Sequence, residues 1–108
     1  TAHGEFKGKN ACTAWVNFDG TTTPPTVRDS FNVSDVVRTA TGKYDVYFET
    51  NIDNTNYNIS SCSEFDFYLI TPVYTNKSIS KFELRIYGAA DNIRNGKEHS
   101  IQIFGGKN

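Results

Sequence analysis

Apolar and polar residues alternate in several short stretches of this chain, and this period of two constrains the fold most. The clearest stretch is Ile79–Tyr87, in which charged and apolar residues alternate. Successive strand residues point to opposite sides of a sheet, so the pattern gives one buried and one solvated face. The same rule predicts these inward-facing side chains: Ala14, Val16 and Phe18; Tyr44, Val46 and Phe48; Phe82, Leu84 and Ile86; His99, Ile101 and Ile103.

A second strand is predicted at Val27–Val33, after an extended Pro-containing loop. Its apolar residues, Val27, Phe31 and Val33, face the core if Asp29 marks a twist or bulge. Alternation then fails at Val36 and Val37, so the residues from Ser34 to the turn at Thr41-Gly42-Lys43 are predicted to be a short connection.

The middle of the chain is less regular. Asn51–Asn58 is dense in Asn and Asp, which favour turn conformations, and is predicted to be a loop. Tyr57–Ile59 and Phe65–Ile70 indicate one long strand or two, with a possible bulge at Ser60–Glu64. Thr71-Pro72 is predicted to end this strand, because proline cannot donate a ladder hydrogen bond.

No segment of helical length has an apolar period of three to four residues. About seven short strands separated by turns favour a small antiparallel β-sandwich, with a small barrel as the alternative. The 108 residues suit one domain, predicted at residues 11–108. Residues 1–10 are predicted to be a linker to an upstream segment.

The charge composition of the chain argues against some classes of binding partner. Eleven basic and twelve acidic residues give a net charge of −1 without a block of like charge, so nucleic acid is not expected as a ligand. No apolar run approaches the roughly eighteen residues of a membrane span. The N-terminus lacks the apolar segment of a signal peptide, and no membrane insertion is expected.

Residues that could carry chemistry are few. Nucleophile-elbow, P-loop and HExxH motifs do not occur, and no enzyme activity, cofactor or metal is predicted. Asp53, Asp66 and Asp91 lack the spacing of a calcium loop, and His99 has the parity of a core residue. Cys12 and Cys62 are interpreted as buried thiols of a protein assembled in a reducing cytoplasm, with a single bridge as the alternative.

Two segments of this chain resemble a sequence pattern of a known protein family. Residues 14–48 read AWVNFDGTTTPPTVRDSFNVSDVVRTATGKYDVYF, and the chain closes with SIQIFGG. This order of WVNFDG, RDSFNVSD and GKYDVYF resembles a pattern found near the C-termini of tail fibres and related virion proteins of tailed bacteriophages. Residues 51–91 match only in the rhythm of their strands.

The resemblance implies a homotrimer, because tail fibres are trimeric as a class. Several aromatic residues have the parity of an outward face: Trp15, Tyr47, Tyr68, Tyr87 and Phe104. Exposed apolar area of this kind marks an interface. Trp15 and Phe104 lie inside the strands that resemble the family, and they are predicted to contact sister chains.

Tyr68, Tyr74, Asn76 and Tyr87 lie in the middle of the chain, where rings beside amides suit a glycan or a surface protein. They are the predicted receptor-binding residues. The predicted function is a non-enzymatic distal module of a virion fibre that attaches to the host cell surface. The alternative is a structural virion module, such as a capsid decoration or fibre-joining domain, without its own receptor. A carbohydrate-active enzyme would need a carboxylate pair that the sequence does not place.

Overall fold

The computed structural model describes residues 12–63, 69–73, 76–87 and 99–108. These residues form two four-stranded sheets, in which all the pairings are antiparallel. The strands are β1 (Cys12–Asp19), β2 (Thr26–Phe31), β3 (Val33–Ala40), β4 (Lys43–Phe48), β5 (Tyr57–Ser63), β6 (Leu69–Val73), β7 (Lys81–Tyr87) and β8 (His99–Gly105).

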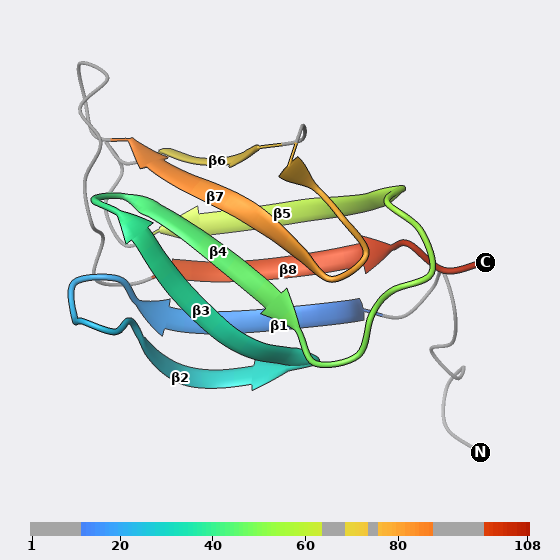
Figure 1. Cartoon of the computed structure of the whole chain (residues 1–108), viewed down its shortest axis with the longest axis horizontal. Helices are drawn as coiled ribbons and strands as arrows, with labels where there is room; N and C mark the ends of the chain where they lie inside the picture. Colours follow the sequence, from blue (N-terminus) through green and yellow to red (C-terminus); the bar gives the residue numbers. More distant parts are fainter. Residues whose placement is uncertain (1–11, 64–68, 74–75, 88–98) are drawn as a thin grey trace.

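The two sheets lie face to face as a sandwich (Figure 1). The first sheet has the order β2-β1-β8-β5, and the second has the order β3-β4-β7-β6. The prediction of an all-β antiparallel sandwich is therefore confirmed, with eight strands in the described part of the chain instead of about seven. In this arrangement β1, β8, β4 and β7 are central, and the other four strands are edges.

The core is built from the alternating residues of the four central strands. The side chains predicted to face inward on β1, β4 and β8 are all buried, as are Phe82 and Leu84 of β7. Ile86 lies outside the residues whose side chains the structure describes. Phe18 packs 5.2 Å from the rings of both Tyr44 and His99, and Phe48 packs 5.6 Å from Phe82. His99 is thus a core residue, as its parity predicts, and its ring centroid lies 6.4 Å from that of Tyr44 in the second sheet.

The strand predicted at Val27–Val33 corresponds to β2 and the first residue of β3, and of its three apolar residues Val33 alone is buried as predicted. Asn17 pairs with Asp29 while Phe18 pairs with Val27, so Arg28 is an extra residue next to the expected irregularity. Phe31 is nevertheless 53% exposed and Val27 is 37% exposed. The reason is that β2 is an edge strand whose Phe31 pairs with Trp15, on the side of the first sheet that faces away from the second.

Residues 34–40 are strand β3 and not the short connection that the sequence predicts. Val36 is buried, whereas its neighbour Val37 is 38% exposed. The two valines therefore point to opposite faces of an edge strand, where an apolar residue is tolerated on both sides. Two register shifts along its pairing with β4 further obscure the alternation.

Strands β5 and β6 correct two further predictions. β5 pairs with β8 without a shift from Tyr57 to Ser63, so residues 60–63 form no bulge. Thr71-Pro72 lies inside β6 and does not end it. Proline is tolerated there because β6 is an edge strand, which needs ladder bonds on one side only. The predicted loop ends at Asn56, one residue before β5.

Cys12 is a free, half-buried cysteine, so the alternative of a Cys12–Cys62 bridge is excluded. Its thiol lies 3.2 Å from the carbonyl oxygen of Ala14. The topology explains why the cysteines stay apart. Cys12 pairs with Phe104, whereas Cys62 pairs with Ser100, so they lie on opposite sides of β8 and several residues apart along it.

The chain crosses from the first sheet to the second at Asn32, which has a positive φ of 54°. Its side-chain amide bonds to both polar groups of the Thr50 backbone. The backbone N–H of Thr50 donates to Asn32 Oδ1 over 2.7 Å, and Asn32 Nδ2 donates to the Thr50 carbonyl over 3.2 Å. The backbone N–H of Glu49 also donates to the Asn32 carbonyl over 3.1 Å. One residue thus joins β2, β3 and the end of β4.

Candidate functional site

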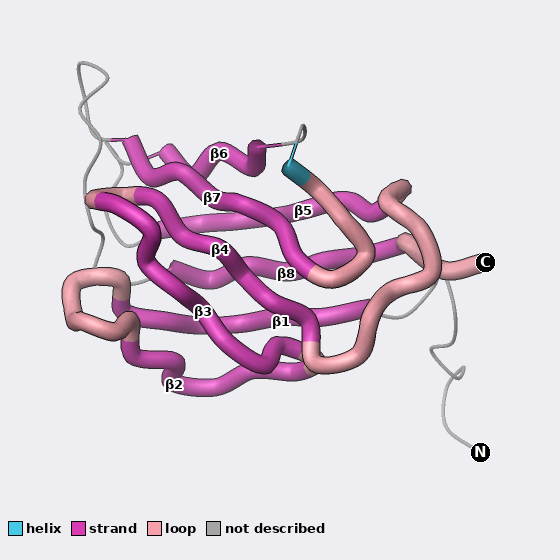
Figure 2. Tube along the Cα trace, in the orientation of Figure 1, coloured by secondary structure: helices cyan, strands magenta, loops and turns pink. Residues whose placement is uncertain are grey.

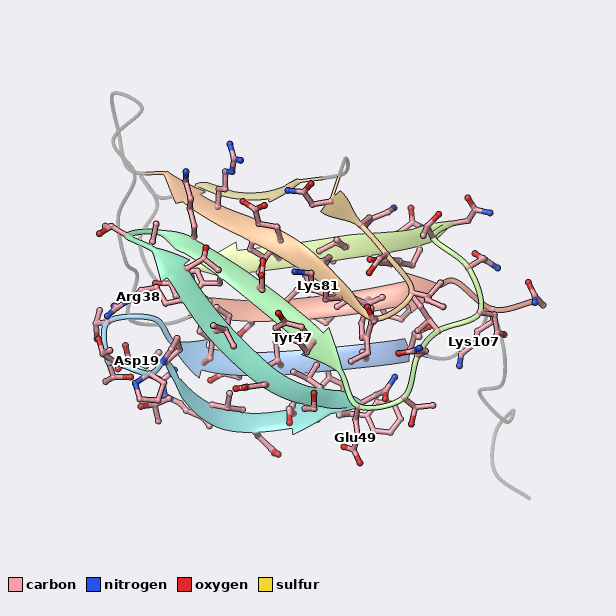
Figure 3. The ribbon with its side chains drawn as sticks, viewed as in Figure 1. Asp19, Arg38, Tyr47, Glu49, Lys81 and Lys107 are labelled. Carbon is pink, nitrogen blue, oxygen red and sulfur yellow. The ribbon has the colours of Figure 1, made fainter. Side chains whose placement is uncertain are left out.

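The outer faces of the two sheets differ in chemistry. The second sheet carries the charged side chains of Lys43, Asp45, Lys81, Glu83 and Arg85, which alternate with the buried residues of β4 and β7. Lys81 pairs with Asp45 over 3.1 Å, and Arg85 pairs with Glu83 over 3.0 Å. Lys81 also lies over the Tyr47 ring, 5.3 Å from its centroid (Figure 3). The carboxylate of Asp45 raises the pKa of Lys81. The outer side of β4 and β7 is therefore polar in the described residues, and two of its ion pairs form between its own side chains.

The first sheet instead presents an aromatic face, formed by Trp15, Phe31 and Phe104. Trp15 pairs with Phe31 on one side and with Gln102 on the other, and Phe104 follows Gln102 on the same side of β8. Diagonal neighbours of this kind lie about 7–8 Å apart, within reach of aromatic rings. Phe31 and Phe104 are more than 40% exposed, and Trp15 is half-buried. The outward parity predicted for Trp15 and Phe104 is confirmed.

A groove of about 310 Å³ opens at one end of this face. We name it the asparagine groove, and its lining residues are Asn54, Asn56, Asn58, Phe104, Gly105, Gly106 and Lys107. The loop between β4 and β5 supplies one wall, and the end of β8 supplies the other. Figures 1 and 2 show this loop passing beside the C-terminus. The groove therefore joins segments that are about fifty residues apart in the sequence.

The floor of the groove is fixed by backbone geometry. Gly105 and Gly106 have φ values of +88° and +71°, which favour glycine. The Gly106 carbonyl accepts hydrogen bonds from the backbone N–H groups of Asp53 over 2.9 Å and Asn54 over 3.2 Å. Thr13 Oγ1 donates to the Gly105 carbonyl over 2.7 Å. These bonds hold both walls of the groove in place.

The side chains in the groove divide into two groups. Asn54 is engaged, because its Oδ1 accepts from the Asn56 N–H and its Nδ2 donates to Asn108 Oδ1. The side chains of Asn56, Asn58 and Lys107 make no hydrogen bond or ion pair within the described part of the chain. None of the described residues that line this groove carries a carboxylate side chain. It thus offers an exposed ring, two amides and one ammonium group to a ligand.

A second hollow, of about 350 Å³, lies at the opposite end, among Thr23–Pro25 and Asp35–Arg38. Figure 3 shows Asp19 and Arg38 at this end and Lys107 at the other. Arg38 is committed here, since its guanidinium donates to the Gly20 carbonyl and to the Thr23 hydroxyl. The turn and the edge strand that line this hollow bond to each other. It therefore offers a ligand fewer free hydrogen-bonding groups than the asparagine groove.

Of the predicted receptor-binding residues, the structure describes the side chain of Asn76 alone. Tyr68 and Tyr74 lie outside the described residues. Tyr87 ends β7, and its side chain also lies outside the description. Asn76 is exposed, and its amide donates to the Glu83 carboxylate. Sequence reasoning missed the groove residues because they are brought together by long-range contacts, namely the pairing of the ends of β5 and β8 and the hydrogen bonds of Gly106. The Asn-rich composition of residues 51–58 is the one sequence signal that points to them.

Comparison with known proteins assigns the chain to no family and no function. No protein-family model, curated protein or solved structure matches this chain significantly.

Within the described ranges, no group of three or more His, Cys, Asp or Glu side chains is placed to hold a metal ion. Asp53 accepts a hydrogen bond from the backbone N–H of Asn108, while Asp66 and Asp91 fall outside those ranges. None of the described segments is a helix long and apolar enough to cross a membrane.

Proposed function

We propose that this chain is a non-enzymatic module at or near the distal end of a phage virion fibre, and that it attaches to a glycan or protein of the host cell surface. The asparagine groove is the observation that carries this proposal. It places an exposed aromatic ring beside unengaged amides on a floor fixed by hydrogen bonds. Rigid aromatic and amide groups of this kind suit recognition without catalysis.

The proposed assembly is a homotrimer in which sister chains cover the aromatic face at Trp15 and Phe31 and leave Phe104, at its margin, open to the groove. Three aromatic residues lie on the same outer side of one sheet, and exposed apolar area of this kind marks an interface. The described outer residues of β4 and β7 are mostly charged, and Lys81 pairs with Asp45 and Arg85 with Glu83, so these two strands offer less apolar area. Three weak sites on one rigid fibre end would strengthen attachment through avidity.

The second candidate is a structural virion module, such as a capsid decoration or fibre-joining domain. The aromatic face favours it, because this surface suits assembly whether or not the groove has a ligand. Phe104 belongs to both surfaces, so a neighbouring chain that covers the face could also reach the groove.

Binding to cells separates the two candidates. The fluorescently labelled chain is incubated with a panel of bacterial strains, and bound fluorescence is measured by flow cytometry. The proposed function predicts saturable binding to a subset of strains and competition with virions that infect them. The variant Asn56→Ala should weaken binding, whereas the exposed control Asn51→Ala should not. Absence of binding to every strain that these virions infect would favour the structural module.

A further inference from the structure

We infer that the asparagine groove binds a carboxylated pyranose, such as a uronic acid unit of an acidic glycan. This inference rests on the proposed attachment function and names the ligand class of its site. Three features of the groove converge on one type of molecule: the Phe104 ring, the amides of Asn56 and Asn58, and the Lys107 ammonium group.

The Phe104 ring selects a ligand with a flat apolar side. Its side chain is 42% exposed at the end of β8, where the following Gly105 and Gly106 carry no side chain that could cover it. An aromatic ring stacks on flat apolar surfaces. A pyranose presents such a surface, formed by its C–H groups, while its hydroxyl groups project around its rim.

The amides of Asn56 and Asn58 suit the hydroxyl groups at the rim of a pyranose. Each carboxamide carries two N–H donors and one oxygen acceptor, and none of these is used within the described structure. A pair of neighbouring hydroxyl groups can donate to the oxygen and accept from the nitrogen of one carboxamide. The two asparagines alternate along the chain with Tyr57, which is buried, so their side chains leave the same side of the backbone.

Lys107 adds the preference for an acid. It lines the groove together with neutral residues and makes no ion pair within the described chain. Two other lysines are engaged: Lys81 pairs with Asp45, and Lys77 donates to the Tyr57 carbonyl over 2.8 Å. A cation in a groove without a carboxylate is complementary to an anionic ligand. A sugar carboxylate meets this charge while the ring remains on Phe104.

Binding of the intact chain is measured by isothermal titration calorimetry. The acidic probes are trigalacturonate, an alginate trimer and sialyllactose, and the neutral probe is maltotriose. We expect at least one acidic probe to bind more tightly than maltotriose. Phe104→Ala should abolish this binding, and Lys107→Gln should weaken it about fivefold, the upper range for an exposed ion pair. Lys43→Gln, the same substitution on the outer face of the second sheet, should leave it unchanged.

Several outcomes would overturn the inference: no acidic probe binds, maltotriose binds as tightly as the acids, or Lys107→Gln has no effect. Displacement of the sugar by inorganic phosphate at equal concentration would show a general anion site and would also contradict it. The cell assay keeps the two proposals apart. If the chain binds cells but groove variants bind equally well, this inference fails while attachment stands. If acidic sugars bind but cells do not, the attachment function fails.

Discussion

Asn32 carries the corner between the two sheets, and its chemistry explains why asparagine stands there. Asparagine tolerates a positive φ better than most residues, and its amide replaces ladder bonds that the chain loses as it changes sheets. The φ value and the side-chain bonds make separate contributions to stability. Substitutions can separate them.

We expect Asn32→Gly to lower the free energy of unfolding by about 1 kcal/mol, because it keeps the backbone conformation but loses the hydrogen bonds to Thr50. Asn32→Ala should lower it by about 1 kcal/mol more, because alanine is strained at positive φ. Urea unfolding of both variants measures the difference. Asn51→Ala is an exposed control and should change stability by less than about 0.5 kcal/mol. Equal stability of the Gly and Ala variants would contradict the argument.

Gly106 is the residue on which the groove depends. A Cβ atom there would lie 3.2 Å from Ile52 Cδ1, from the Asn54 carbonyl oxygen and from Tyr57 Cβ. Gly106→Ala should therefore destabilise the chain by about 1–3 kcal/mol. It should also speed hydrogen exchange at the Asp53 and Asn54 amides, which donate to Gly106. Gly42→Ala, at a positive φ in the β3–β4 turn, should be strained without changing exchange at these amides.

The buried tyrosines predict how stability depends on pH. Burial raises the pKa of Tyr44 from 10.0 to about 12, against the opposing effect of Arg38, and burial also raises the pKa of Tyr57. The folded state thus favours the neutral phenols. Their contribution is fully present below the unfolded pKa of 10.0 and is lost as the pH rises from there toward about 12.

Urea midpoints should accordingly fall across this alkaline range, and phenolate absorbance should rise together with unfolding. Tyr57→Phe should reduce the slope of stability against pH in this range. Tyr47→Phe, on the outer face of the second sheet, is the matched control. A slope that is the same in the wild type and Tyr57→Phe would show that Tyr57 is not responsible.

At the scale of elements, the sequence predicts the central strands well and the edge strands poorly. On β1, β4, β7 and β8, the described inward side chains are buried between the two sheets, so burial imposes strict alternation. The errors fall on edges: the burial of Phe31 in β2, the missed β3, the bulge expected in β5 and the early end of β6. Edge strands are less covered, so valine pairs, serines and a proline are tolerated there.

The candidate site was harder to predict for a related reason. Residues 51–56 are correctly predicted as a loop, but composition does not say which part of the chain lies beside it. That neighbour is fixed by the pairing of Tyr57 with Gly105 and by the hydrogen bonds of Gly106. Long-range contacts of this kind leave little trace in local periodicity. The receptor residues predicted from aromatic parity therefore differ from those in the groove.

The edge position of β2 leads to a prediction for Phe31. Because its ring is 53% exposed, Phe31→Thr should change the free energy of unfolding by less than about 1 kcal/mol. The buried Phe82→Ala should lower it by about 3–5 kcal/mol. Thermal unfolding at low protein concentration compares the two. A large loss of stability in Phe31→Thr under these conditions would show that the ring supports the fold itself and not an interface.

At the scale of the whole molecule, the contrast between the outer faces predicts how copies associate. We expect light scattering coupled to size exclusion to give about three times the chain mass of 12.1 kDa. Phe31→Thr combined with Trp15→Ser should give a monomer. The aromatic face is largely uncharged, so raising the salt concentration should not dissociate the trimer. A monomer for the wild type at all concentrations would contradict the proposed assembly.

The binding of the β4–β5 loop by the Gly106 carbonyl also has a practical consequence. It anchors the last residues beside the groove, where Asn108 bonds to both Asn54 and Asp53. An affinity tag or fluorescent protein fused after Asn108 would emerge at the rim of the groove and obstruct it. Immobilisation through that terminus would therefore hide the recognition surface from a glycan in solution.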